Sequence, residues 1–266
     1  MESSKFHLTD AKIKALRNLA EFFCLCQRDL TALSYGTTTP SNERAMRRTI
    51  SLLEAEKLTD WRVLAPRTRK RGSVPIIYGL TKKGVALVEE EGLSTTATKV
   101  FKPNSDTLLP HEYEISMFHL RLKTLCEQRG WKLYWQQRDL KCRVNPDALM
   151  GITDATGNTW WYFLEIEKTK PGNFKNGESK IMRNLSKYCS YFNTDQCERE
   201  WGNFRKFRVI VAQRTDERRT NLLKMLEIKY KHRMLWLTTE LSYREDIGGK
   251  IFLTPKDYAT ESYSLM

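Results

Sequence analysis

Residues 160–167 constrain the fold of this chain more than any other stretch, because they form an apolar strand pattern that carries two carboxylates. Successive side chains of a strand point to opposite faces. Leu164 and Ile166 therefore share one face, and Glu165 and Glu167 lie on the other. Two carboxylates on one face of an apolar strand repel each other and are costly to bury. The stretch predicts either a solvated acidic edge strand or a site that holds a cation.

The rest of the C-terminal half alternates between helix and strand patterns. Further strands are predicted at residues 131–135, 144–150, 207–212, 234–238 and, as a short edge strand, 250–255. Helical patterns begin near Pro110 and Ile181, and Thr215 is expected to cap a helix over residues 216–231. Such alternation predicts a mixed α/β sheet that is covered by helices on both faces.

Asp147 lies on the strand pattern before residues 160–167 and offers a third carboxylate. Hard divalent cations are held by a few carboxylate oxygens together with water and phosphate. We therefore expect Asp147, Glu165 and Glu167 to bind Mg²⁺ or Mn²⁺. Such a site can activate a water molecule and stabilise the pentacoordinate phosphate of a cleaved phosphodiester.

The pattern Pro146-Asp147, followed by Glu165-x-Glu167, resembles the PD-(D/E)xK nuclease fold, whose signature lies on adjacent strands. The lysine of that signature is replaced here by Glu167. Lys168 follows directly, but it is expected to project to the opposite face. The resemblance implies a restriction-endonuclease-like domain with nuclease chemistry.

Two helices are expected to contribute further residues to this site. Lys187 and Tyr191 flank the apolar stripe of the helix after the strand, so Lys187 is a candidate for the catalytic lysine. A solvent-facing lysine is the alternative, and Tyr191 is expected to pack. The resemblance implies Glu114, on the first helix, as a further acid. His111 borders the buried face of that helix and is equally explained as a half-buried histidine.

The first 92 residues predict a winged helix-turn-helix. Helical patterns occupy residues 10–24 and 29–34, a third helix is capped by Ser41, and a last one covers 85–91. Between the last two helices, strand patterns at 61–64 and 76–78 flank a basic loop that contains glycine. Two strands joined by such a loop make a wing.

Seven cations of this segment are candidates for DNA contacts: Arg44, Arg47, Arg48, Arg67, Arg69, Lys70 and Arg71. The first three lie near the start of the third helix and off its apolar stripe, where cations oppose the helix dipole. A recognition helix presents its N-terminal residues to the major groove, where phosphates and guanine edges accept cations. The other four lie in the wing. A solvated helix face, and for the wing a solvated loop or a localisation signal, are the alternatives.

The charge balance favours a polyanionic partner. Lys and Arg number 45 against 32 Asp and Glu, a formal net charge of +13, which predicts attraction to double-stranded DNA. An acidic membrane is a poorer match, because the chain has no lipidation motif and no apolar run near the roughly 20 residues of a membrane span. The six cysteines form neither a C-x-x-C pair nor zinc spacing, and the N-terminus is polar. We expect a cytoplasmic, reduced, zinc-free protein.

Residues 93–107 have polar turn composition without periodicity, which predicts a linker. The expected organisation is a winged-helix domain at 1–92, the linker at 93–107 and a nuclease-like α/β domain at 108–266. The expected fold class is therefore α/β, with a winged helix-turn-helix in front of a restriction-endonuclease-like mixed sheet.

The order of these motifs resembles the replication-relaxation family of plasmid and mobile-element proteins, which includes the MobC-type conjugative relaxases. The motifs are Tyr78-x-Leu80-Thr81-x-x-Gly84, His111, Pro146-Asp147, Leu164-Glu165-Ile166-Glu167-Lys168-Thr169 and Lys187-Tyr188-x-x-Tyr191. The resemblance spans roughly residues 8–255. The family's usual Glu-Val-Asp-x-x-Thr appears here as residues 165–170 with the sequence EIEKTK, which leaves the exact metal ligands open.

The resemblance implies a plasmid mobilisation relaxase, a metal-dependent endonuclease that nicks one DNA strand at an origin of transfer or replication, with accessory mobilisation proteins as partners. The four histidines contain no pair separated by a single residue, which argues against the relaxase design with a histidine metal cluster and a tyrosine nucleophile. Carboxylates and a water nucleophile are expected instead. The alternatives are a non-catalytic plasmid replication or regulatory DNA-binding protein with a nuclease-like domain, and a restriction-type enzyme that cuts both strands.

Overall fold

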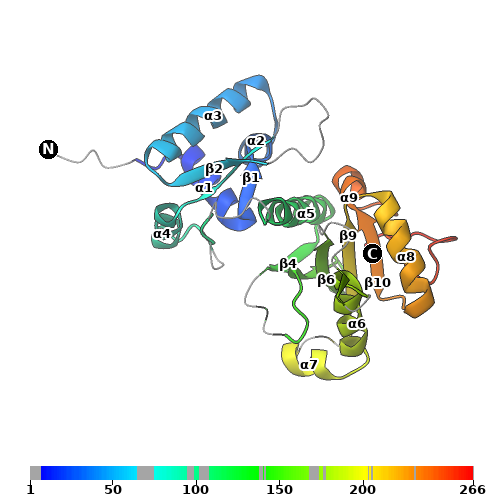
Figure 1. Cartoon of the computed structure of the whole chain (residues 1–266). Coiled ribbons are helices and arrows are strands. Elements are labelled where there is room, and N and C mark those ends of the chain that lie inside the picture. The colour runs from blue at the N-terminus through cyan, green and yellow to red at the C-terminus, as the bar shows by residue number, and fades with distance from the viewer. Residues whose placement is uncertain are drawn as a thin grey trace. The chain divides into compact units, whose positions relative to one another are not determined.

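The computed structural model describes residues 7–64, 75–94, 99–101, 108–137, 140, 142–167, 174–175, 178–202, 204, 206–230 and 232–265. The protein has a mixed α/β fold and divides into two compact units, Met1–Met117 and Phe118–Met266. The division falls within helix α5 (Leu109–Arg129). Figure 1 labels the helices and the strands for which there is room, in both units.

The first unit combines helices with a three-stranded antiparallel sheet. Its elements are α1 (Asp10–Phe22), β1 (Cys24–Cys26), α2 (Gln27–Tyr35), α3 (Pro40–Ala55), β2 (Thr59–Val63), β3 (Ile76–Leu80), α4 (Lys82–Glu90) and the start of α5. Strand β3 is central and pairs with β1 on one side and β2 on the other. The four expected helices and the two expected strands are present, with ends shifted by a few residues.

The prediction that Cys24 continues the first helix is wrong. Helix α1 ends at Phe22, Phe23 has a φ of 64°, and Cys24 begins strand β1 opposite Gly79. A positive φ at a residue other than glycine costs about 1–3 kcal/mol. Burial of Cys24 and Leu25 and the backbone hydrogen bonds to β3 outweigh this cost.

The N-cap of helix α3 lies two residues earlier in the chain than predicted. Thr39, rather than Ser41, is the N-cap, and its Oγ1 accepts a hydrogen bond of 3.3 Å from the backbone N–H of Asn42. Pro40 is the first helical residue, a position at which a missing N–H costs nothing.

The Thr81-x-x-Gly84 motif has a structural reason in the first unit. The hydroxyl of Thr81 accepts a hydrogen bond of 3.1 Å from the N–H of Gly84 and thereby caps α4. The same hydroxyl donates to the carbonyl oxygen of Lys57 at 2.6 Å. A Cβ at Gly84 would collide with the carbonyl oxygen of Leu58, so the position requires glycine.

Part of the predicted linker packs on the first unit. Phe101 is 3% exposed, and its N–H donates to the carbonyl oxygen of Leu80 at 2.7 Å. Its ring lies 5.9 Å from that of Phe23 and so close to Gly79 that a Cβ there would collide with it. Phe101 therefore belongs to the core of the first unit.

The second unit is built on one five-stranded sheet. After α5 its elements are β4 (Lys132–Gln136), β5 (Ala148–Thr153), β6 (Thr159–Glu167), β7 (Phe174–Lys175), β8 (Glu178–Ser179), α6 (Lys180–Phe192), α7 (Gln196–Trp201), β9 (Arg208–Gln213), α8 (Asp216–Lys229), β10 (Leu235–Thr239) and α9 (Glu240–Asp246). The strand order is β10-β9-β6-β5-β4. Strands β4, β5 and β6 are antiparallel neighbours, whereas β6, β9 and β10 run parallel because helices return the chain between them.

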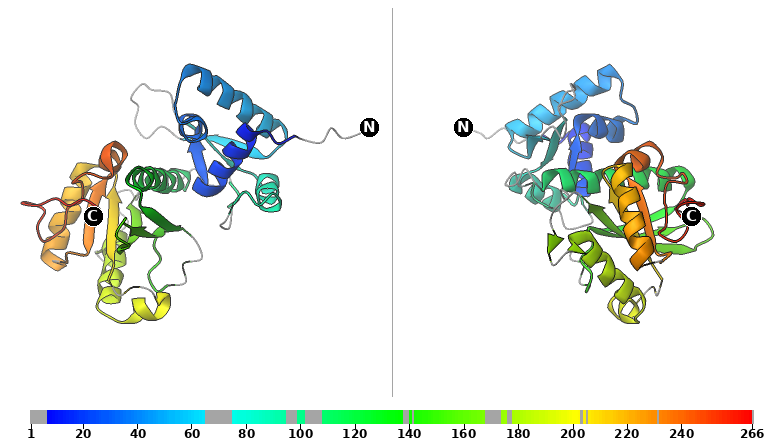
Figure 2. Two further views of the ribbon diagram at one scale, coloured as in Figure 1. Left: turned by 180° about the vertical axis from the view of Figure 1, so that it is seen from behind. Right: turned by 45° about the vertical axis from the view of Figure 1, so that its right-hand side comes forward.

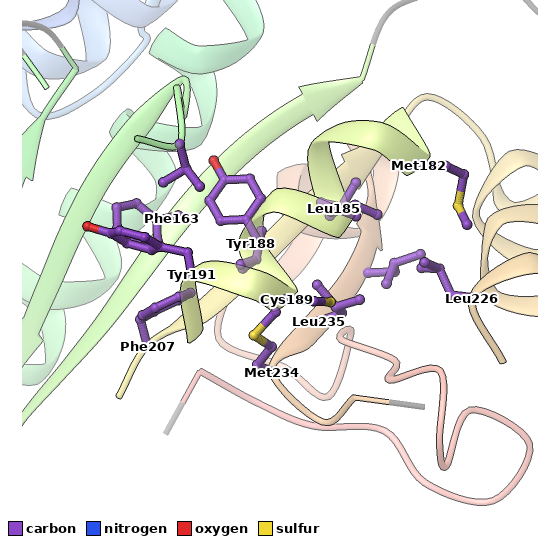
Figure 3. Close-up of a cluster of buried hydrophobic side chains, with 14 of the residues drawn as sticks. Phe163, Met182, Leu185, Tyr188, Cys189, Tyr191, Phe207, Leu226, Met234 and Leu235 are labelled. Carbon is purple, nitrogen blue, oxygen red and sulfur yellow. The ribbon is translucent and has the colours of Figure 1, made fainter. Parts of the chain in front are cut away.

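Helices α6 and α8 cover one face of this sheet. Phe163, Val209 and Leu235 share that face and pack with Leu185 of α6 and Leu226 of α8 in one buried cluster (Figure 3). Helix α8 runs along β10, as the right-hand view of Figure 2 shows.

The second part of α5, helix α9 and the C-terminal residues cover the opposite face. The ring of His119 in α5 stacks on Trp135 of β4 at 4.2 Å between centroids. Trp236 stacks on Tyr263, and the hydroxyl of Tyr162 donates to the carbonyl oxygen of Leu265. The expected sheet with helices on both faces is therefore present.

Several element boundaries of the second unit differ from the prediction. Strand β5 begins at Ala148, so Asp147 directly precedes it. The edge strand expected at residues 250–255 is wrong, since this stretch forms only isolated bridges such as that between Leu237 and Leu253. The short elements β7, β8, α7 and α9 were beyond prediction, because they contain too few residues to show a periodic pattern.

His119 makes the stability of the second unit depend on pH. Burial, with the charge of Lys123, lowers the pKa of His119 to about 3, whereas an unfolded histidine titrates near 6.5. As the pH falls from about 6.5 towards 3, the unfolded chain therefore takes up a proton that the folded chain does not, and the folded state loses stability.

The His119→Phe variant keeps a ring on Trp135 and removes the titration. We expect its free energy of unfolding in urea to fall less between pH 7 and pH 4.5 than that of the wild type, by up to about 1.4 kcal/mol per pH unit. An equal fall in both proteins would contradict this account, and exposed His7→Gln is the control.

Candidate acidic site and nucleic-acid interface

Asp147 is held beside strand β6 by two backbone hydrogen bonds. Its N–H donates to the carbonyl oxygen of Leu164 at 2.9 Å, and its Oδ2 accepts from the N–H of Ile166 at 2.7 Å. These two partners flank Glu165 in the chain. The carboxylate of Asp147 therefore lies at the backbone beside Glu165, with Asp147 directly before β5 and Glu165 within β6.

The carboxylate of Glu165 is buried on the face that α6 covers. Glu165 is 8% exposed, and its Oε1 accepts a hydrogen bond of 2.6 Å from the hydroxyl of Tyr188 in α6. A buried carboxylate requires hydrogen bonds or an opposite charge. Tyr188, itself 1% exposed, supplies one of these bonds and fixes the orientation of the carboxylate.

Burial and nearby acidic groups act together on the hydroxyl of Tyr188. Its pKa is raised well above the ordinary value of 10, first by burial and then by the charge and hydrogen bond of Glu165. The charge of Asp147 raises it further, and that of Cys142 adds to this effect. The hydroxyl of Tyr188 thus stays protonated as a hydrogen-bond donor, beside the two carboxylates Asp147 and Glu165.

Glu167 ends strand β6 at the same edge of the sheet. It is half-buried and lies opposite Gln213, the last residue of β9, in the parallel register. In α/β sheets, ligands bind outside the carboxyl ends of parallel strands. Asp147, Glu165, Glu167 and Gln213 therefore line one end of three neighbouring strands, which is the candidate acidic site.

The other predicted residues of this site have different surroundings. Lys187 is exposed on α6, directly before Tyr188. Tyr191 donates a hydrogen bond of 2.6 Å to Glu200 of α7, away from Glu165. Glu114 is buried in α5 and belongs to the first unit, and His111 of the same helix is half-buried. Lys168 lies outside the described residues.

The carboxylate oxygens of the acidic site are suitable ligands for a hard cation, although fewer than three such side chains lie close together among the described residues. Carboxylate oxygens are what Mg²⁺ and Mn²⁺ bind, through one or two side chains together with substrate phosphates. In the part of the chain that the structure describes, no three His, Cys, Asp or Glu side chains form a group that could hold a metal ion. All six cysteines are free thiols.

The first unit carries a second candidate surface on α3. Arg44, Arg47 and Arg48 are exposed there, while Met46 and Ile50 point into the core, as the stripe predicts. The wing cations Arg67, Arg69, Lys70 and Arg71 lie outside the described residues.

The β2–β3 hairpin, whose last described pair is Val63 and Ile76, contacts α3 through β2. Burial and the charge of Glu54 raise the pKa of Tyr78 in β3, while the charge of Arg47 lowers it, so Arg47 lies near the hairpin. Three large apolar side chains are exposed on the hairpin, namely Trp61, Val63 and Ile76, of which Val63 and Ile76 pair directly. The cations exposed on α3 and the apolar side chains exposed on the hairpin therefore both belong to the first unit.

Two residues of the acidic site escape sequence reasoning. Tyr188 appears in the sequence analysis only within the family motif Lys187-Tyr188-x-x-Tyr191, without a role in the site. A buried tyrosine hydroxyl needs a hydrogen-bond partner, and this need was the available signal. Gln213 falls one residue beyond the strand predicted at 207–212. Its signal is a polar residue at the carboxyl end of a parallel strand.

No helix among the described residues is both long and apolar enough to cross a membrane.

A known protein family matches residues from both units of the chain. The model of the replication-relaxation family matches residues 16–207, which is more than half of the chain. The match includes most of the first unit together with Asp147, Glu165 and Tyr188. No curated protein and no solved structure matched the chain. The chain belongs to the replication-relaxation family, a membership that implies interaction with DNA and suggests a role in plasmid replication or mobilisation.

Proposed function

We propose that this protein is a plasmid mobilisation relaxase, a site-specific and metal-dependent endonuclease that nicks one DNA strand at an origin of transfer or replication. The observation that carries the proposal is the meeting of Asp147 and Glu165 beside Tyr188 at one end of the sheet. The order of elements α5-β4-β5-β6-α6-β9 supports a PD-(D/E)xK nuclease domain, with Asp147 before its second strand and Glu165 in its third.

In this proposal Asp147 and Glu165 hold Mg²⁺ or Mn²⁺, with Glu167 as a further ligand and a DNA phosphate completing the set. The bound cation supplies charge neutralisation at the phosphate and a water of lowered pKa. In the nicking step a water oxygen forms a bond to phosphorus, the bond from phosphorus to one sugar oxygen breaks, and the leaving oxygen takes up a proton. Lys187 remains a candidate for moving protons, and a role for Glu114 remains what the family resemblance implies.

The first unit supplies the DNA address in this proposal. Its α1-β1-α2-α3-β2-β3-α4 order and its β1-β3-β2 sheet support a winged helix-turn-helix in which α3 is the recognition helix. The exposed cations Arg44, Arg47 and Arg48 then contact phosphates and guanine edges of double-stranded DNA. The wing cations at residues 67–71 are proposed to contact the backbone, and accessory mobilisation proteins to join the complex.

A non-catalytic replication or regulatory protein is the second candidate. The observation that favours it is that no group of three potential metal ligands is gathered within the described ranges. In that case the α/β unit serves assembly, and alanine at Asp147 or Glu165 leaves the function intact.

The nicking test separates these candidates. A DNA site is first selected by the full chain from a random-sequence duplex library and cloned into a negatively supercoiled plasmid. We expect the wild type to convert this plasmid to the open circle with Mg²⁺ or Mn²⁺ and not with EDTA. Asp147→Ala and Glu165→Ala should each reduce the rate at least about a hundredfold, since each removes a ligand of the proposed cation. Linear product would indicate a double-strand cutter, and equal rates for wild type and Asp147→Ala would sink the enzyme proposal.

Tyr188→Phe tests whether the hydrogen bond to Glu165 supports the site. Removing the hydroxyl takes one orienting hydrogen bond from the Glu165 carboxylate, and groups that orient metal ligands typically contribute about 10–100-fold to metal affinity. We expect the Mn²⁺ affinity, measured by calorimetry, and the Mg²⁺ dependence of nicking to weaken by about tenfold. Tyr191→Phe is the matched control, because it removes a hydrogen bond of the same length to Glu200 from the same helix. Equal effects of the two variants would refute a specific role for Tyr188.

Arg47→Ala tests the recognition surface on α3. The loss of one phosphate contact should weaken binding to the selected duplex and reduce the slope of log affinity against log salt by about one. Arg17→Ala removes the same charge from an exposed position of α1 and serves as the control. The outcome against the proposal is a salt slope that changes equally in both variants, as measured by fluorescence anisotropy between 50 and 300 mM salt (about the range in which such slopes are resolved).

A further inference from the structure

Gln213 is a buried polar residue at the acidic site, and its side-chain amide nitrogen lacks a hydrogen-bond partner among the described residues. It is 3% exposed, and its Nε2 makes no hydrogen bond within the described part of the chain. A buried N–H group that has left water without a replacement partner destabilises the folded state. Such a group in a native structure therefore calls for an explanation, and a ligand that arrives later is one.

The position of Gln213 points to the acidic site. Gln213 lies directly opposite Glu167, and Val211 lies opposite Glu165. Residues directly opposite each other in neighbouring strands point to the same face of a sheet. Gln213 is therefore on the face of the two glutamates and at the carboxyl end of β9, where sheets of this kind bind their ligands.

The chemistry of the amide selects the kind of ligand atom. A side-chain amide nitrogen only donates hydrogen bonds, so its partner must be an acceptor. The acceptors of the site itself are carboxylates, and none of the described ones is bonded to this nitrogen. A phosphate oxygen of DNA is the acceptor that the proposed substrate brings, and a neutral donor holds it without competing with a cation for Glu165 and Glu167.

We propose that Gln213 is a substrate-binding residue whose side-chain amide donates a hydrogen bond to a phosphate oxygen of the DNA at the acidic site. This inference rests on the proposed function, since it requires DNA at this end of the sheet. It adds a contact on a third strand, β9, to the carboxylates beside β5 and on β6.

Stability without DNA gives the first test. Gln213→Met keeps a side chain of similar length and removes the donor. Thr238→Val is the matched control, because Thr238 is also buried with an unpartnered hydroxyl, but lies on β10 in line with Ala212, which places it on the opposite face. Both variants should raise the melting temperature of the DNA-free protein by about 2–4 °C, since each removes an unpaired buried polar group. A fall for Gln213→Met would indicate a purely structural amide and overturn the proposal.

Binding of a modified duplex gives the second test. The probe is the selected duplex with single phosphates replaced, one at a time, by uncharged methylphosphonate, and affinity is measured in Ca²⁺ buffer. The wild type and Thr238→Val should lose about tenfold or more at the contacted phosphate, whereas Gln213→Met should bind the unmodified duplex weakly and lose little more at that phosphate. The same loss pattern in Gln213→Met and wild type would overturn the proposal.

The two proposals fail in different ways. If the wild type does not nick DNA and the coupling between Gln213 and one phosphate is present, the nicking proposal fails and Gln213 is still a phosphate-binding residue. If the wild type nicks and Gln213→Met binds and nicks at the wild-type level, only the inference on Gln213 is wrong.

Discussion

The packing of the second unit has to accommodate a buried carboxylate, that of Glu165 on the central strand β6. Glu165 lies on a strand that is paired on both sides, and α6 covers its face. A charge in this position is stable only with hydrogen bonds or an opposite charge, so the position of α6, which brings the Tyr188 hydroxyl to Glu165, is part of the solution. The helix that fills the core with Leu185 also holds the acid. Helix α6 therefore contributes both to the packing of the core and to the geometry of the site.

The alternating pattern of residues 160–167 was enough to predict half of the site. It places Glu165 and Glu167 on one face, and the register of β6 confirms that they share it with Phe163, which lies in the buried cluster. Asp147 is predicted on the neighbouring strand, and its hydrogen bonds confirm its position beside β6. Metal binding by these carboxylates stays a prediction.

Tyr188 and Gln213 were out of reach for a physical reason. A tyrosine in an apolar stripe is adequately explained by packing, and the partner of its hydroxyl depends on where the helix crosses the sheet. Gln213 depends on the register of β9 against β6, which joins residues far apart in the chain. Neither the partner of the Tyr188 hydroxyl nor the neighbour of Gln213 can be read from a short stretch of sequence. The same limit explains Cys24, whose strand exists only because β3 pairs with it from more than fifty residues away.

The two strand pairings that build the site differ in the length of chain that each one closes. Asp147 reaches β6 through the β5–β6 hairpin, across a short turn at residues 154–158, so the two acids approach by local contacts that close quickly. The parallel pairing of β9 requires the crossover through α6 and α7 and carries a larger entropy of loop closure. The placing of Asp147 beside Glu165 therefore depends on the local hairpin, whereas Gln213 depends on the long-range pairing of β9 with β6. The complete site therefore requires the long-range pairing of β9 with β6 in addition to the local β5–β6 hairpin.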